Sequence, residues 1–470
     1  MTRPASMIRC SGCGHVADPG DTVSPFPFPF RCPLAGTDDV DHVLTRVLNP
    51  DAVRFPAAPS APSAPSGGEA NPFVRYRTLM HSYHVATARG ISDAGYRDLV
   101  TSLDAAVADV DGRGFRVTPF FRSAGLSEAL GFAAAGGVWV KDETGNVSGS
   151  HKGRHLMGVL IHLTVMAQAG LLDPEDRPDL AIASCGNAAL AAAVVARAGG
   201  WRLTVFVPPE ADPVITGRLC ELQAKVITCP REPGVPGDPA YLRLREELGR
   251  GAVPFTTQGP QNGLAIEGGQ TLGYELVTDL AAGPGVLDHL IVQVGGGALA
   301  SACVQALREA ADLGALGRSP RLPRIHTVQT YGAHPLEQAY ERVRALLPNT
   351  AGPGEPGPGA VRRAMATAAA HRSEFMRPWP EPPRSVATGI LDDETYDWRA
   401  VVEGMLLTGG RPLVVTEDSL VAANELAVTG TGIPVDPTGS AGLGGLMEMR
   451  RRGEVGDDDR VAVLFTGVRR

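Results

Sequence analysis

The sequence predicts an α/β fold in which helices cover sheets made mainly of parallel strands. Short apolar runs alternate with longer segments of helical composition along most of the 470 residues. This alternation is typical of βαβ units. The run at 290–294 is almost continuously apolar, which indicates a strand buried on both faces of a sheet. The length of the chain favours at least two domains.

The individual elements follow from these runs. The expected strands share branched apolar side chains and lie at 138–140, 180–183, 203–207, 226–228, 290–294, 325–328 and 461–465. We expect the strand at 226–228 to be buried. Helices are expected at 154–169, at 187–198 and around 362–372, the last within a Pro- and Gly-rich excursion at 349–384.

Composition shifts divide the chain into parts. A head with three of the seven cysteines occupies 1–50, and a linker rich in Pro, Ala and Ser occupies 51–70. We expect a smaller domain at 151–262. The larger domain is expected to combine 71–150 with 263–470.

Charge and composition argue against several classes of protein. The net charge of −8 and the absence of a long basic run argue against nucleic-acid binding. No stretch approaches 18 uninterrupted apolar residues, so we expect no membrane span. Seven cysteines spread over a long chain indicate reduced thiols and a cytoplasmic protein.

Lysine is rare in this chain, which draws attention to Lys152. Only three of the 43 lysine and arginine residues are lysines. Arginine therefore serves wherever a plain positive charge suffices, whereas a lysine amine can lose its proton and form a Schiff base with a carbonyl. Lys152 lies in the small-residue loop Gly-Ser-His-Lys-Gly-Arg at 149–154. Lys141 and Lys225 lie beside expected strands and are interpreted as structural.

Three further motifs offer binding groups. The Gly-Gly-Gly-Ala-Leu turn at 295–299 follows an apolar strand and exposes backbone N–H groups at a helix start, which suits a phosphate. The Ser-Cys-Gly-Asn turn at 184–187 offers donors to a carboxylate or a phenolate oxygen. Thr438 and Ser440 supply neutral hydroxyls. With a reactive amine, these groups describe a pocket for pyridoxal 5′-phosphate.

The order and local sequence of these motifs resemble the fold-type II pyridoxal-phosphate enzymes, the tryptophan synthase β family, and within it threonine synthase. The resemblance extends to Asn-Pro-Phe-Val-Arg-Tyr at 71–76, Thr-Pro-Phe at 118–120 and Phe-Thr-Gly at 465–467. It covers residues 71–470. It implies two three-layer αβα domains with the cofactor in the cleft between them, the larger binding the cofactor and the smaller binding the substrate. It also implies a small N-terminal zinc-ribbon-like head and a homodimer.

The resemblance also implies roles for individual residues. Lys152 is the Schiff-base lysine and the proton shuttle, and Asn187 hydrogen-bonds the cofactor O3′. Thr438, or alternatively Ser440, faces the pyridine nitrogen, and a neutral hydroxyl there suits elimination and replacement. The phosphate is bound by the amides of Gly295, Gly296, Gly297, Ala298 and Leu299, and the substrate carboxylate by Ser184, Cys185 and Gly186.

The chain departs from threonine synthases inside the pocket. His151 stands where Phe is usual, and Cys185 stands where Ser or Thr is usual. His151 is either a packing residue beside the cofactor or a second acid/base group. These changes leave the substrate open among O-phosphohomoserine, serine or threonine, and an activated β-substituted amino acid.

The predicted function is therefore elimination or replacement on an amino acid with a β- or γ-leaving group, by a lyase or synthase similar to threonine synthase. The alternatives are a serine/threonine dehydratase, that is, an ammonia-lyase, and a β-replacement enzyme of specialised metabolism. A further alternative is a non-catalytic regulatory protein on the same fold. The intact Lys152 argues against that last alternative, because the chemistry fails without it.

The cysteine spacing of the head resembles a zinc ribbon. Cys10 and Cys13 are spaced like one knuckle, and a second knuckle begins at Cys32 but lacks its second cysteine. Structural zinc takes four ligands, commonly four cysteines or three cysteines and a histidine. His42 is favoured over His15, which follows Cys13 too closely. We expect one structural zinc on Cys10, Cys13, Cys32 and His42; the alternative is a degenerate ribbon without metal.

Overall fold

The structure is a computed structural model of the 470-residue chain. It describes residues 4–17, 30–36, 38–56, 70–173, 175–232, 234–235, 237–283, 285–316, 321–348 and 357–470. Most of the expected linker, at 57–69, lies outside these residues. Within the described part of the chain, no helix is both long and apolar enough to cross a membrane.

The larger of the sheets has six strands in the order β12-β11-β10-β13-β5-β4. All neighbours run parallel except β4, which is antiparallel to β5 at the sheet's edge. Strand β10 is buried along its whole length, as its apolar sequence predicts. The strands are β4 Phe120–Ser123, β5 Gly137–Asp142, β10 His289–Gln293, β11 Arg324–Thr330, β12 Pro412–Val415 and β13 Arg460–Phe465.

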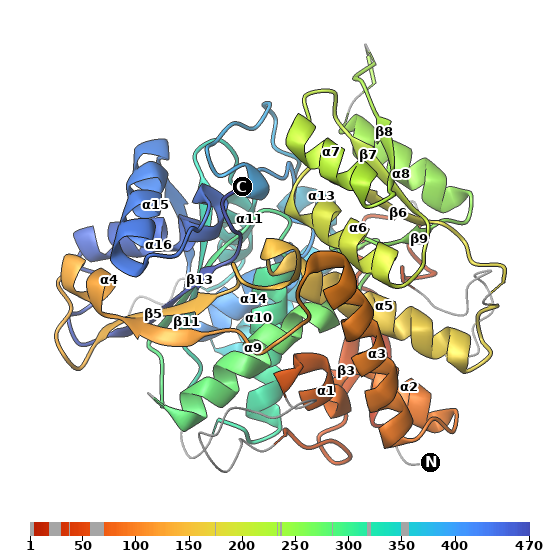
Figure 1. The fold of residues 1–470 in the computed structure, drawn as a ribbon. Coiled ribbons are helices and arrows are strands. Elements are labelled where there is room, and N and C mark those ends of the chain that lie inside the picture. The colour runs from red at the N-terminus through yellow and green to blue at the C-terminus, as the bar shows by residue number, and fades with distance from the viewer. Residues whose placement is uncertain are drawn as a thin grey trace.

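Helices cover both faces of this sheet (Figure 1). Successive side chains of a strand point to opposite faces. Along β13, Val463 accordingly packs into the core under α15 and α16, and Leu464 into the core under α10 and α14. The helices of these layers are α9 Ala265–Ala282, α10 Ala298–Asp312, α14 Trp398–Thr408, α15 Glu417–Thr431 and α16 Pro437–Arg451.

A second sheet is formed by four parallel strands in the order β8-β7-β6-β9. Val205 joins the core shared with α5 and α6, whereas Phe206 joins a core with Leu244 of α8. The elements are β6 Leu180–Ala183, β7 Leu203–Val207, β8 Lys225–Thr228, β9 Val253–Pro254, α5 Lys152–Gln168, α6 Asn187–Ala198, α7 Pro213–Glu221 and α8 Pro239–Gly249.

One expectation about this sheet is wrong. Strand β8 was expected to be buried, but Lys225 and Thr228 at its two ends are exposed and the residues between them are only half-buried. The reason is topological, because β8 lies at the edge of the sheet and pairs only with β7.

The N-terminal strands form a small antiparallel sheet in the order β2-β1-β3. Arg46 of β3 is buried, and its guanidinium lies 2.6 Å from Glu309 of α10 and 3.3 Å from Glu267 of α9. The N-terminal segment is therefore anchored to the helices of the larger sheet by buried ion pairs. The strands are β1 Ser6–Cys10, β2 Val16–Ala17 and β3 Leu44–Leu48.

The remaining α-helices connect and cover these layers. The excursion expected to be helical around 362–372 contains two helices, α12 Pro358–Ala370 and α13 Arg372–Phe375. The others are α1 Pro72–Arg75, α2 His81–Ala88, α3 Asp93–Asp111, α4 Ala124–Ala129 and α11 Pro335–Arg344. The predicted domain boundaries stay a prediction.

A fully buried ion network lies beneath the first turn of α5. Arg154 donates to Glu143 at 2.8 Å and to Glu275 at 2.6 Å, and Lys141 lies 2.8 Å from Glu275. All four side chains are at most 1% exposed. Lys141 thus serves a structural role, as the sequence indicated.

Removing the charge of Arg154 should destabilise the fold strongly. In an Arg154→Met variant, Glu143 loses the cation that offsets its burial and Glu275 keeps only Lys141, and breaking a buried pair in this way costs about 3–5 kcal/mol. Urea denaturation followed by circular dichroism measures this loss. The matched control is Arg202→Met, because Arg202 and its partner Asp179 are both exposed. The loss of unfolding free energy in this control should stay below about 1 kcal/mol. Equal losses in the two variants would contradict the assignment.

Candidate active site and metal-binding cluster

The predicted motifs meet at one edge of the six-stranded sheet. Strands β10, β13 and β5 are parallel neighbours, so their carboxyl ends lie side by side. The glycine turn, which we define as residues 295–299, follows β10. Phe465 ends β13, and the loop that leads to Lys152 follows β5. Ligands of α/β proteins bind at this edge.

The loop before Lys152 is held in place by the C-terminal segment. Gly149 has a φ of +67°, and a Cβ there would lie 2.5 Å from Cγ1 of Val468, so a glycine is required. Ser150 forms an isolated β-bridge with Gly467. The N–H of His151 donates to the carbonyl of Thr466 at 3.1 Å. The position of Lys152 is thus fixed by backbone contacts with the Phe-Thr-Gly motif at 465–467 and with Val468.

Lys152 is the first residue of α5, and its amine is biased toward the neutral form. Burial lowers the pKa of Lys152, and the carboxylates of Asp392 and Asp397 offset only part of this effect. The positive end of the helix dipole also disfavours a cation at this position. A lysine with a lowered pKa has more neutral amine available for attack on a carbonyl.

His151 and His155 form a neutral aromatic pair beside this amine. Their ring centroids are 5.7 Å apart. Burial, and then the charge of Lys152, lower the pKa of His151 well below its usual value, and that of His155 to about 3. The His151 ring lies 3.3 Å from the carbonyl of Thr466. A neutral, packed ring favours the packing interpretation of His151 over an acid/base role.

The glycine turn is shaped to bind an anion. Gly297 has a φ of +93°, and a Cβ on Gly295 would lie 2.3 Å from Oδ2 of Asp392. The N–H of Gly296 donates to the Asp392 carboxylate, which stands in for an oxyanion at the start of α10. The turn therefore fits a phosphate in its chemistry, since backbone donors at a helix N-terminus are the usual phosphate ligands.

Sequence reasoning missed two acids at this turn. Burial raises the pKa of Asp392 to about 6, and the Gly296 N–H and Lys152 offset this only in part. Burial likewise raises the pKa of Asp397 to about 7. The residues lie in an acidic run, 392–397, which was the available indication in the sequence. Two carboxylates beside an anion-binding turn, Asp397 buried and Asp392 half-buried, make this site unfavourable for additional negative charge.

Asn187 lies at the start of α6, and both the oxygen and the nitrogen of its side-chain amide have hydrogen-bond partners. Its oxygen accepts a hydrogen bond from Arg470, which also donates to the carbonyl of Ser148 at 2.5 Å. Its side chain also hydrogen-bonds Asp436, whose pKa burial raises to about 6. Gly467 lies between them, because a Cβ there would be 2.9 Å from both Nδ2 of Asn187 and Oδ2 of Asp436. The sequence offered no indication of the role of Arg470.

The two candidate hydroxyls of the fourth motif differ in their surroundings. Ser440 is fully buried; its Oγ accepts from Nδ2 of Asn424 and donates to the carbonyl of Asp436, both at 3.0 Å. Thr438 is half-buried, and its Oγ1 accepts from the N–H of Gly389 at 3.0 Å. The Thr438 hydroxyl is therefore the one that retains a proton to donate.

The Ser-Cys-Gly turn at 184–186 follows β6 and is half-buried to exposed. The Gly186 N–H lies 3.4 Å from the Oγ of Ser184. Burial raises the pKa of the Cys185 thiol, and Asp238, Glu210 and Asp392 raise it further. Cys185 is consequently a neutral thiol in an acidic neighbourhood.

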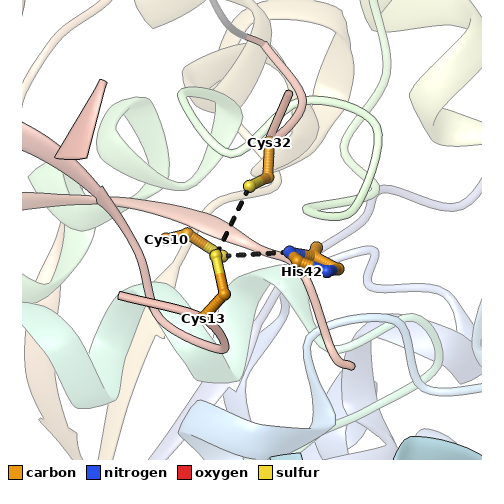
Figure 2. Close-up of side chains that lie close together, drawn as sticks. All are labelled: Cys10, Cys13, Cys32 and His42. Atoms are coloured by element: carbon orange, nitrogen blue, oxygen red, sulfur yellow. Dashed lines mark hydrogen bonds between the residues drawn. The ribbon is translucent and has the colours of Figure 1, made fainter. Parts of the chain in front are cut away.

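The four predicted zinc ligands lie together in the N-terminal segment. Their ligand atoms all lie within 4.8 Å of one another, and Figure 2 shows the three thiols and the His42 ring converging. The Sγ of Cys10 lies 3.6 Å from Nδ1 of His42, and the Sγ atoms of Cys13 and Cys32 are 3.8 Å apart. The opposite ring nitrogen, Nε2, lies 3.2 Å from Asp38.

Comparison with known proteins identifies the family. Residues 113–467 match the family described as pyridoxal-phosphate dependent enzyme. Threonine synthase of Methanocaldococcus jannaschii is 24% identical over 355 residues, which cover 74% of each chain. Threonine synthase of Mycobacterium leprae is 25% identical and is matched over 74% of this chain and 80% of its own.

Solved structures of the same fold also match. Threonine deaminase isoform 2 of Solanum lycopersicum has a TM-score of 0.54 and 16% identity, covering 81% of this chain and 91% of that one. Diaminopropionate ammonia lyase of Escherichia coli has a TM-score of 0.55 and 16% identity, covering 80% and 89%. The predicted α/β fold and the predicted class, a pyridoxal-phosphate-dependent lyase or synthase, are thereby confirmed. The chain belongs to the family of pyridoxal-phosphate-dependent enzymes.

Proposed function

We propose that the enzyme eliminates or replaces a β- or γ-substituent of an amino acid, in the manner of threonine synthase. The proposal rests on Lys152. Its amine has a lowered pKa, lies at the start of a helix and interacts electrostatically with Asp392, whose carboxylate accepts a hydrogen bond from the glycine turn. Bound pyridoxal phosphate supplies the electron withdrawal that such chemistry requires. The threonine synthase relatives support the same reaction class.

The residues around Lys152 have different roles in binding the cofactor and the substrate. The amides of the glycine turn would hold the phosphate of bound pyridoxal phosphate, and Lys152 would hold and move the α-proton of the substrate. Asn187, which hydrogen-bonds Asp436 here, would donate to the cofactor O3′, and the Thr438 hydroxyl would donate to the pyridine nitrogen. The turn at 184–186 binds the substrate carboxylate through its backbone N–H groups and the Ser184 hydroxyl.

Dehydration of serine or threonine is the second candidate reaction. The carboxylates of Asp392 and Asp397 lie next to the glycine turn. O-phosphohomoserine carries a phosphate in addition to that of the cofactor. It would bring about two further negative charges toward these two carboxylates. This acidic surrounding favours substrates whose β- or γ-substituent carries no charge before it leaves, such as hydroxy amino acids or O-acetylserine.

A substrate panel tests both candidates. Purified enzyme is assayed with O-phosphohomoserine, serine, threonine and O-acetylserine, and both keto acid and amino acid products are measured. Turnover of serine or threonine to a keto acid identifies the dehydratase, and threonine from O-phosphohomoserine identifies the synthase. No turnover of any of the four by protein that contains its full complement of cofactor would overturn the proposed reaction class.

We further propose that the N-terminal cluster binds one structural zinc through Cys10, Cys13, Cys32 and His42. Three thiolates and one imidazole are a usual ligand set for structural zinc. His42 coordinates through Nδ1, because Asp38 hydrogen-bonds Nε2 and fixes the tautomer, as carboxylates do for zinc-binding histidines. The zinc stabilises the same segment that anchors Arg46 to α9 and α10.

Zinc removal should loosen the N-terminal segment and leave the cofactor bound. Metal analysis of protein purified without chelator should give one zinc per chain. His42→Ala should lose that zinc, and Asp38→Asn should weaken zinc binding roughly 10–100-fold, because it removes the hydrogen bond that orients the imidazole. His15→Ala is the control and should retain it. Absence of zinc from the wild-type protein, or its retention in His42→Ala, would defeat the assignment.

We propose that the enzyme is a cytoplasmic homodimer. None of its seven cysteines forms a disulfide, which supports a reducing compartment. Light scattering coupled to size exclusion measures the subunit number directly, and a monomeric mass would reject the dimer.

A further inference from the structure

Arg470 reaches the start of α6 from a segment that two other loops hold in place. After β13, the N–H of Val468 donates to the carbonyl of Gly149 at 2.9 Å. The N–H of the next residue, Arg469, donates to the carbonyl of Pro434 at 2.8 Å. The backbone that carries Arg470 is therefore fixed to the loop before α5 and to the loop before α16.

The guanidinium of Arg470 connects two parts of the candidate site. One of its nitrogens donates to Oδ1 of Asn187, and another donates to the carbonyl of Ser148 at 2.5 Å. Ser148 is itself held, because its N–H donates to the carboxylate of Asp111 at 2.9 Å. A planar guanidinium that bridges two acceptors has a defined orientation. Arg470 therefore presents a fixed positive charge to the oxygen of the Asn187 amide.

This contact determines which way the Asn187 amide points. An arginine only donates hydrogen bonds, and an ionised carboxylate only accepts them. Arg470 accordingly pairs with the amide oxygen, and Asp436 pairs with Nδ2. Nδ2 carries two N–H groups, and Asp436 takes one of them. The same two partners fix the direction of the second N–H, which is the group that a cofactor oxygen can use.

Arg470 also offsets the negative charge of Asp436. Burial raises the pKa of Asp436 to about 6, and the N–H of Gly439 and the charge of Arg470 counteract part of this effect. Without Arg470, the ionised carboxylate beside Asn187 would oppose a second anionic oxygen at the same amide.

We propose that Arg470 is a positioning residue for the cofactor, because it orients the Asn187 amide so that Nδ2 donates to the cofactor O3′. Its charge also strengthens that donation, since hydrogen bonds in a chain polarise one another. Arg470 acts through Asn187 and not by direct contact with the reacting atoms. The proposal rests on the role proposed above for Asn187.

Two cofactor analogues test this role by equilibrium dialysis with the full chain, freed of its cofactor. One is 4′-deoxypyridoxine 5′-phosphate, and the other is the same compound without its 3-hydroxyl group. Arg470→Met should bind the hydroxylated analogue roughly tenfold more weakly than the wild-type protein does, because a charge-assisted hydrogen bond is impaired. Its affinity for the analogue without the hydroxyl should be unchanged. A merely structural role would weaken the binding of both analogues equally, which would overturn the proposal.

The matched control is Arg469→Met, which removes an equal charge from the neighbouring, exposed side chain. It should bind both analogues as the wild-type protein does. Melting temperatures verify that each variant is folded. A loss in Arg469→Met as large as that in Arg470→Met would show that net charge, and not the contact with Asn187, accounts for the effect.

A double-mutant cycle separates this proposal from the role of Asn187 itself. If Arg470 acts through Asn187, Arg470→Met should cause no further loss of affinity for the hydroxylated analogue in an Asn187→Ala background. A loss in Asn187→Ala but none in Arg470→Met would overturn the positioning role alone. Unchanged affinity in Asn187→Ala would overturn the proposed role of Asn187 as well. A loss from Arg470→Met that persists in full without the Asn187 amide would also contradict the proposal.

Discussion

A Lys152→Ala variant should lose all turnover together with the yellow colour that the cofactor gives to the wild-type protein. Burial lowers the pKa of the Lys152 amine, so that it can attack a carbonyl. Alanine offers no group that does so. Proton transfer by such a group contributes typically 10²–10⁴-fold, and loss of covalent attachment adds to this. Absorbance spectra and the substrate panel measure the two effects separately.

The control for this variant is the exposed lysine at the start of β8. Lys225→Ala should retain both colour and turnover, because Lys225 lies at the edge of the four-stranded sheet. A Lys152→Ala protein that kept the visible band of the wild type would show that another amine binds the cofactor.

An Asp392→Asn variant should bind the cofactor phosphate more tightly than the wild-type protein does. The Asp392 carboxylate occupies the N–H of Gly296 and would lie against the incoming phosphate. Two unit charges ~5 Å apart repel by about 3 kcal/mol at an effective dielectric constant of ~20. We therefore expect at least a roughly tenfold gain in affinity at pH 8. The probe is 4′-deoxypyridoxine 5′-phosphate, which has no aldehyde, so that Lys152 does not affect the result.

The gain in phosphate affinity of the Asp392→Asn variant should depend on pH in a defined direction. The raised pKa of Asp392, about 6, means that its carboxyl is largely protonated below pH 6 and repels the phosphate only above it. The ratio of the wild-type to the Asp392→Asn dissociation constant should therefore rise as pH increases through about 6 and then level off. Protonation of the phosphate itself affects both proteins and cancels in the ratio.

The neighbouring acid provides the control for this effect. Asp393 is half-buried, and burial also raises its pKa, but no hydrogen bond to the glycine turn is described for it. Asp393→Asn should change the dissociation constant less than roughly threefold. Weaker binding in Asp392→Asn, or a ratio that does not change with pH, would show that this carboxyl supports the phosphate instead of opposing it.

The sequence was sufficient for the elements whose local pattern and burial agree. Helix α6 begins at Asn187 and ends at Ala198 as predicted, because an alanine-rich run between a Gly-Asn turn and a Gly-Gly pair leaves little choice of boundary. Strand β10 is as buried as its apolar run indicated. Local sequence failed for β8, since edge position is a property of the sheet and not of the strand.

The residues of the candidate site also fall into those that a local pattern predicts and those that only the fold brings together. Lys152 and the glycine turn could be predicted from the sequence because their chemistry resides in short motifs. Asp392, Asp397 and Arg470 reach the site from segments far along the chain, and only the fold brings them to Gly296 and Asn187. Their roles depend on burial, which raises the pKa of both aspartates, and burial of a polar residue cannot be inferred from its neighbours in sequence.

Peptide mapping of the borohydride-reduced holoenzyme tests the central claim most directly. Reduction fixes the cofactor to the lysine that binds it, and mass spectrometry locates the added mass among the three lysines of the chain. We predict the label on Lys152, at the start of α5. A label on Lys225 or Lys141, or no labelled lysine in protein that contains the cofactor, would contradict the account.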